Sequence, residues 1–122
     1  MTQENKQLLL KDLCVRLLYF DLWVQYNNKD WLAIGYGHER IELLPSIFSS
    51  ISGPCPLIDE IKPYLRSMSS ITEEEWKEYN QTIGKSFSFT DEVDWLNAHQ
   101  FDYRGLIEKG LALEAPKDMY NF

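Results

Sequence analysis

The chain has 122 residues, of which 44% are hydrophobic and 14% aromatic, so it is long and apolar enough for one compact domain over residues 1–122. It has no run of about 18 apolar residues, and its start lacks a basic region followed by an apolar block, so we expect neither a membrane span nor a signal peptide. The two cysteines, Cys14 and Cys55, lie far apart and predict reduced thiols in the cytoplasm.

The formal net charge of −7 is concentrated in the second half of the chain. Residues 1–71 carry 8 acids and 7 bases, whereas residues 72–122 carry 11 acids and 5 bases. An acidic surface repels phosphate backbones, which argues against nucleic-acid binding. It suits a basic protein partner, or it serves only to keep the protein in solution; both interpretations stay open.

The first third of the chain predicts a helix followed by antiparallel strands. Leucines at helical spacing predict an amphipathic helix over residues 3–19, with Asp12 and Arg16 outside its apolar stripe. Alternating residues and short turns then predict a meander of three strands. These strands are expected at residues 20–26, 31–36 and 39–44.

A serine- and proline-rich irregular loop is expected at residues 45–56, a length typical of a functional or partly disordered segment. Residues 57–66 are ambiguous between helix and strand. Because Pro63 disfavours a helix interior, we prefer an edge strand, in which proline is tolerated. Ile61 and Leu65 would then face the core.

The clearest local signal is the start of a helix at Thr72. Thr72 and Glu75 have the spacing of a capping box, and Ile71 and Trp76 flank it at the positions of a hydrophobic staple. Acidic residues in the first turn suit the positive end of the helix dipole. We therefore predict a helix over residues 72–83, in which Trp76 belongs to one apolar stripe.

Two more helices and a last strand complete the predicted fold. Thr90 is expected to cap a helix over residues 91–99, and Asp102 a short helix over residues 103–109. Residues 111–114 alternate like a strand. The predicted class is α+β, with an N-terminal helix, an antiparallel meander of three or four strands, and two or three C-terminal helices.

Three stretches resemble proteins of a known kind. They are LLLKDLCVRL (residues 8–17), IKPYLRSMSSITEEE (residues 61–75) and DWLNAHQFDYRGLIEKGLALEAP (residues 94–116). They resemble short hypothetical proteins encoded on prophages and other mobile elements of gut Bacteroidetes. The resemblance implies a bacterial or phage protein of the cytoplasm, and it implies no activity.

Motifs that carry chemistry are sparse. The sequence has no phosphate-binding glycine loop, and neither histidine sits in a zinc motif, so we expect no metal and no cofactor. Asp91 and Asp94 could hold Mg²⁺ or Ca²⁺, as a metal-dependent phosphodiesterase or nuclease would need. Helix-dipole compensation explains the same residues fully, and we prefer it. Ser69 and Ser70 lack a GxSxG setting and are interpreted as turn residues.

Two groups of residues are candidates for ligand binding, because cations beside an aromatic ring can hold a phosphate or carboxylate while the ring stacks on a base. Each group has a structural alternative: an edge strand protected by charge for the first, and a core aromatic with a surface arginine for the second. The first group is Lys62, Tyr64 and Arg66. The second is Trp95, Tyr103 and Arg104.

The leading hypothesis is a non-enzymatic interaction or modulator domain with a host or phage protein as its partner. The alternative is a protein that binds or sequesters a small anionic, nucleotide-like ligand. The 17 aromatic residues also leave a homodimer open. We expect no binding to nucleic acid and no association with a membrane.

Overall fold

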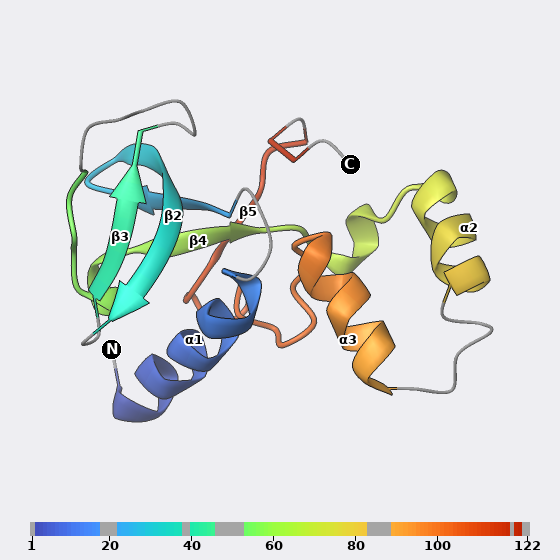
Figure 1. Ribbon diagram of the computed structural model, residues 1–122, viewed down its shortest axis with the longest axis horizontal. Coiled ribbons are helices and arrows are strands. Elements are labelled where there is room, and N and C mark those ends of the chain that lie inside the picture. The colour runs from blue at the N-terminus through green and yellow to red at the C-terminus, as the bar shows by residue number, and fades with distance from the viewer. Residues whose placement is uncertain are drawn as a thin grey trace.

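The computed structural model has an α+β fold, and in the residues that it describes this fold comprises an N-terminal helix, a five-stranded sheet and two further α-helices (Figure 1). It describes residues 2–17, 22–37, 40–45, 53–82, 89–117 and 119–120. In chain order the elements are α1 (Gln3–Arg16), β1 (Trp23–Tyr26), β2 (Lys29–Gly37), β3 (Arg40–Leu44), η1 (Ile58–Glu60), β4 (Lys62–Leu65), η2 (Met68–Ser70), α2 (Glu73–Thr82), α3 (Phe89–Ala98) and β5 (Leu113–Glu114).

The first three strands form the predicted antiparallel meander, at one side of a sheet with the order β3-β2-β1-β4-β5. The β1–β2 turn contains only Asn27 and Asn28, because Tyr26 pairs with Lys29. Both asparagines have positive φ, 54° and 61°. A two-residue type I′ turn requires that geometry, and asparagine tolerates it better than most residues.

The prediction that β4 is an edge strand is wrong, because β4 lies between β1 and β5. It pairs antiparallel with β1, where Pro63 is opposite Val24, and parallel with β5. Beyond Pro63, a side chain replaces the backbone hydrogen bonds between β1 and β4. The Tyr120 hydroxyl accepts from the backbone N–H of Trp23 (2.9 Å) and donates to the carbonyl of Tyr64 (2.8 Å). The Tyr120 hydroxyl therefore bridges β1 and β4 at the position next to the last backbone pair, Val24 and Pro63.

Among the described residues the core has two parts. The main cluster joins α1 to one face of the sheet, and it includes Ile61 and Leu65 at 1% and 0% exposure, as predicted. The smaller cluster, Trp95, Leu96 and Phe101, joins α3 to the residues that follow it. Figure 1 shows α1 against the sheet, whereas α2 and α3 lie beyond the end of β4.

Helix boundaries differ from the predictions at three places. α1 ends at Arg16, and residues 18–20 lie outside the described part of the chain. α3 begins at Phe89, so Thr90 lies inside its first turn and is not its cap. Residues 103–109 form turns instead of a helix, and Asp102 accepts from the N–H groups of Leu106 (2.9 Å) and Ile107 (3.0 Å).

Two surface predictions also change. Asp12 and Arg16, expected outside the apolar stripe of α1, are both 0% exposed. Residues 46–52 of the predicted loop lie outside the described residues, but residues 53–57 run along β3. The N–H groups of Ile41 and Leu43 donate to the carbonyls of Pro56 (3.0 Å) and Pro54 (3.1 Å), so this segment covers the outer edge of β3.

No helix in the described ranges is long and apolar enough to span a membrane.

Candidate functional site

A groove with a volume of ≈ 750 Å³ lies between α2 and the C-terminal segment, which we define as residues 114–117 and 119–120. Its lining residues come from four parts of the chain: the end of β4 and η2, helix α2, the residue after α3, and the C-terminal segment. They are Arg66, Ser70, Thr72, Glu74, Glu75, Glu78, His99, Glu114, Ala115, Pro116, Lys117 and Tyr120.

The base of the groove is held by the ion pair of Arg66 and Glu75. The Arg66 guanidinium donates to both carboxylate oxygens, from Nη1 at 2.7 Å and from Nη2 at 2.5 Å. The two side chains are only 13% and 11% exposed, and the guanidinium carbon lies 4.3 Å from the ring centroid of Phe101. Two parallel hydrogen bonds and a stacked ring fix the orientation of Arg66.

Glu75 also completes the predicted capping box. Its Oε1 accepts from the N–H of Thr72 at 3.1 Å, and its own N–H donates to the Thr72 hydroxyl at 3.1 Å. Burial tends to raise the pKa of Glu75, but the bonds and charge of Arg66 and the bonds to Thr72 outweigh it and hold the pKa below its ordinary value. Glu75 is therefore an ionised carboxylate that joins α2 to β4.

His99 and Glu78 line the groove, and both contact Trp95. His99 stacks on Trp95 with ring centroids 4.0 Å apart, and its Nδ1 lies 2.9 Å from the Trp95 carbonyl. A carbonyl only accepts, so Nδ1 carries a proton. Glu78 accepts from the Trp95 indole N–H at 3.3 Å and lies 3.7 Å from His99 Nε2. These contacts position a carboxylate at the groove.

The charges that remain at the groove are mostly negative. Arg66 and Glu75 compensate each other. The other acidic and lysine side chains in the lining are the carboxylates of Glu74, Glu78 and Glu114 and the ammonium of Lys117. The groove therefore attracts cations more strongly than anions.

The residues of the first predicted binding group point to different neighbours. Lys62 is exposed, Tyr64 is 8% exposed, and Arg66 pairs with Glu75. The Tyr64 hydroxyl donates to Asp30 at 2.6 Å, and burial together with this bond raises the pKa of Tyr64. Of the three, only Arg66 lines the groove, and its guanidinium already holds a carboxylate there.

The second predicted binding group lies mostly inside the protein. Trp95 is 7% exposed in the smaller core cluster, and Tyr103 packs against that cluster. Arg104 is not a free surface cation: its Nε donates to Asp12 at 3.1 Å, and its guanidinium carbon lies 5.0 Å from the Tyr103 ring. This arrangement stabilises the junction of α1 with the segment after α3.

The sequence did not predict the buried polar cluster of Asp12, Arg16 and Arg104 at that junction. Asp12 accepts from Arg16 Nε at 2.6 Å as well as from Arg104, and Arg16 Nη2 donates to the carbonyl of Phe101 at 2.5 Å. The only sequence signal was the four-residue spacing of Asp12 and Arg16, which favours an ion pair on a helix but does not say that the pair is buried.

The candidate metal and nucleophile residues gain no support. Asp94 is exposed, the side chain of Asp91 lies outside the described residues, and no group of three metal-ligating side chains occurs in the part of the chain that the structure describes. Ser70 donates to the carbonyl of Ser67 at 2.7 Å, as expected of a turn residue. Ser69 lies 3.1 Å from the Ser67 hydroxyl.

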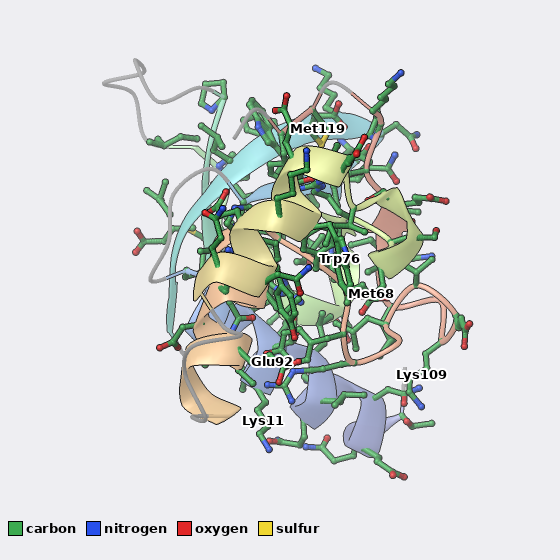
Figure 2. The ribbon with its side chains drawn as sticks, turned by 90° about the vertical axis from the view of Figure 1, so that its right-hand side faces the viewer. Lys11, Met68, Trp76, Glu92, Lys109 and Met119 are labelled. Carbon is green, nitrogen blue, oxygen red and sulfur yellow. The ribbon has the colours of Figure 1, made fainter. Side chains whose placement is uncertain are left out.

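Helix α2 is largely exposed to solvent. Only Glu75 and Tyr79 among its described side chains are buried or half-buried. Trp76, predicted to belong to a packed stripe, is 52% exposed and stacks on Tyr79 with centroids 5.6 Å apart. Figure 2 turns this end toward the viewer and shows Trp76 beside α2 and Met68, 45% exposed, at η2.

Comparisons with known proteins found no matching family model, no matching curated protein and no matching solved structure. The resemblance to mobile-element proteins of Bacteroidetes stays a prediction.

Proposed function

We propose that this protein is a non-enzymatic interaction domain that binds a protein partner at the end formed by α2 and its groove, in the cytoplasm of a bacterial host. The observation that carries the proposal is the exposure of α2. A ten-residue helix is marginal by itself, and this one is fixed to the body through one face only. Its remaining face presents Trp76 to solvent, at 52% exposure.

Trp76 is the natural anchor for such a partner. Tryptophan is strongly enriched among the residues that dominate binding energy at interfaces, because it buries a large rigid surface at a small entropic cost. The ring of Tyr79 stacks on the Trp76 indole, so this contact orders the indole in the unbound protein.

The anion-binding alternative has less support. Arg66, the cation that would hold a phosphate, is engaged by Glu75 through two hydrogen bonds and stacked on Phe101. Opening that pair would leave a carboxylate uncompensated beside the incoming anion. A nucleotide-like ligand would also face Glu74 and Glu78 across the groove.

A photo-crosslinking amino acid at position 76, compared with the same group at position 34, tests the proposal. Ile34 on β2 is the matched control, because it is an exposed apolar residue with 51% exposure, away from α2. We expect a discrete protein adduct in bacterial cells from position 76 and none from position 34. Equal labelling at both positions, or no adduct at either, would refute the proposal.

A further inference from the structure

We infer that the segment bound at α2 is basic: a stretch of lysine and arginine residues with an apolar anchor, whose cations meet the acidic groove while the anchor covers Trp76. This inference rests on the proposed interaction function and adds the chemistry of the partner. It follows from the charge, the exposed apolar side chains and the groove that meet at this end of the molecule.

The charge of α2 selects the partner. The helix carries four glutamates and one lysine, and only Glu75 among the glutamates is buried against a cation of the body. Glu73 and Lys77 lie 4.0 Å apart with 86% and 70% exposed side chains, a pair that water and salt largely screen. Glu74 and Glu78 line the groove. Glu78 accepts from the Trp95 indole N–H but keeps 55% of its side chain exposed, so its carboxylate can also meet a guanidinium or ammonium group.

The groove extends this negative surface onto the C-terminal segment. Glu114 lines the same groove as Glu74 and Glu78, so acidic residues of α2 and of β5 contribute to one groove. Its volume of ≈ 750 Å³ falls in the range of about 300–1,000 Å³ typical of ligand sites and leaves room for long side chains. An arginine side chain of the partner suits the groove best, because the N–H donors of its planar guanidinium can bridge two carboxylates.

Trp76 and Met68 form the surface on which the apolar anchor of the bound segment would pack. They are 52% and 45% exposed, among the large hydrophobic side chains with the greatest exposure in the described ranges. An aliphatic or aromatic anchor can pack on the indole, and an arginine of the partner can lie over its face as a cation–π contact. Alternating basic and apolar residues therefore match this surface.

A second copy of the chain is a poorer occupant. Each chain carries a net charge of −7, and a two-fold contact through α2 would place the acidic helix of one copy on that of the other. Like charges brought together at an interface oppose association. Nucleic acid is disfavoured by the same sign of charge.

Binding of labelled synthetic peptides, followed by fluorescence anisotropy, tests the inference. Three peptides share length and apolar anchors and carry arginine and lysine, serine, or glutamate at the other positions. We expect only the basic peptide to bind, with an affinity that falls as salt rises. Trp76→Ala should weaken binding about tenfold or more, whereas Ile34→Ala should leave it unchanged.

A pair of charge-matched triple variants locates the site. Removing the groove carboxylates should weaken binding of the basic peptide by about tenfold in total, whereas removing three exposed acids elsewhere should have little effect. The groove variant is Glu74→Gln, Glu78→Gln and Glu114→Gln; the control variant is Glu4→Gln, Asp59→Asn and Glu108→Gln.

The outcomes separate the two proposals. Equal weakening by both triple variants, binding of the serine peptide as tight as that of the basic one, or dimerisation through α2 would overturn the basic occupant. If the adduct at position 76 forms in cells but the basic peptide does not bind, the interaction function stands and this inference fails. Loss of the adduct removes the interaction function as well.

Discussion

Replacing Glu75 with glutamine isolates the charge that joins α2 to the body. The carboxylate accepts two hydrogen bonds from Arg66 and one from the N–H of Thr72. Glutamine keeps the size and one carbonyl acceptor, so it can preserve the bond to Thr72. It removes the counter-ion of a guanidinium that is only 13% exposed.

The expected loss of unfolding free energy is about 2–3 kcal/mol. Breaking a fully buried ion pair by removing one partner costs about 3–5 kcal/mol, whereas exposed pairs contribute about 0–1 kcal/mol. The pair of Arg66 and Glu75 is close to the buried limit but keeps a path to water through the groove. The control Thr72→Ala removes only the helix cap and should cost about 1 kcal/mol.

The pH dependence gives an independent check. Because the pKa of Glu75 in the folded protein lies below its ordinary value of 4.5, its contribution to stability is complete above about pH 4.5 and is lost as the pH falls through the folded pKa. Urea unfolding of wild type and Glu75→Gln should therefore differ by the full amount at pH 7 and converge in acid. A difference below about 1 kcal/mol, or one that is the same at pH 7 and in acid, would refute this account.

Two further substitutions test the contacts that hold the fold together. Tyr120→Phe removes the hydroxyl that bridges the N–H of Trp23 and the carbonyl of Tyr64. It should lower the free energy of unfolding in urea by about 1–3 kcal/mol and speed hydrogen exchange at the N–H of Trp23. An unchanged unfolding midpoint would show that water replaces the hydroxyl. Asp12→Asn leaves the buried guanidinium of Arg16 and the partly buried guanidinium of Arg104 without their carboxylate, and it should cost about 3–5 kcal/mol in urea unfolding. A loss near that of a surface change such as Asp59→Asn would contradict the buried pair of Asp12 and Arg16.

Local features were the ones that sequence reasoning predicted well. The capping box at Thr72 and Glu75, the antiparallel meander of three strands, and the core-facing Ile61 and Leu65 all agree with the structure. Each depends on contacts within a few residues or on the alternation of one strand. Such signals are present in the order of the residues before any tertiary contact forms.

The candidate site was harder to predict, because it depends on which distant segment approaches each charge. Arg66 was interpreted as an anion-binding cation, yet the helix that begins a few residues later supplies Glu75 as its counter-ion. Trp76 was placed in a packed stripe, but α2 contacts the body mainly through Tyr79 and Glu75, and the indole is left outside. Helical periodicity defines a face and does not say what covers it.

By itself, then, the sequence determined the α+β class, the N-terminal helix, the antiparallel meander and the acidic character of the second half. Tertiary structure alone decided that β4 is an interior strand, where Tyr120 bridges backbone groups 97 and 56 positions away. It also decided that Asp12 is buried, since its second cation, Arg104, is separated from it by 92 positions. Contacts of that range depend on how whole elements pack, and no local pattern records them.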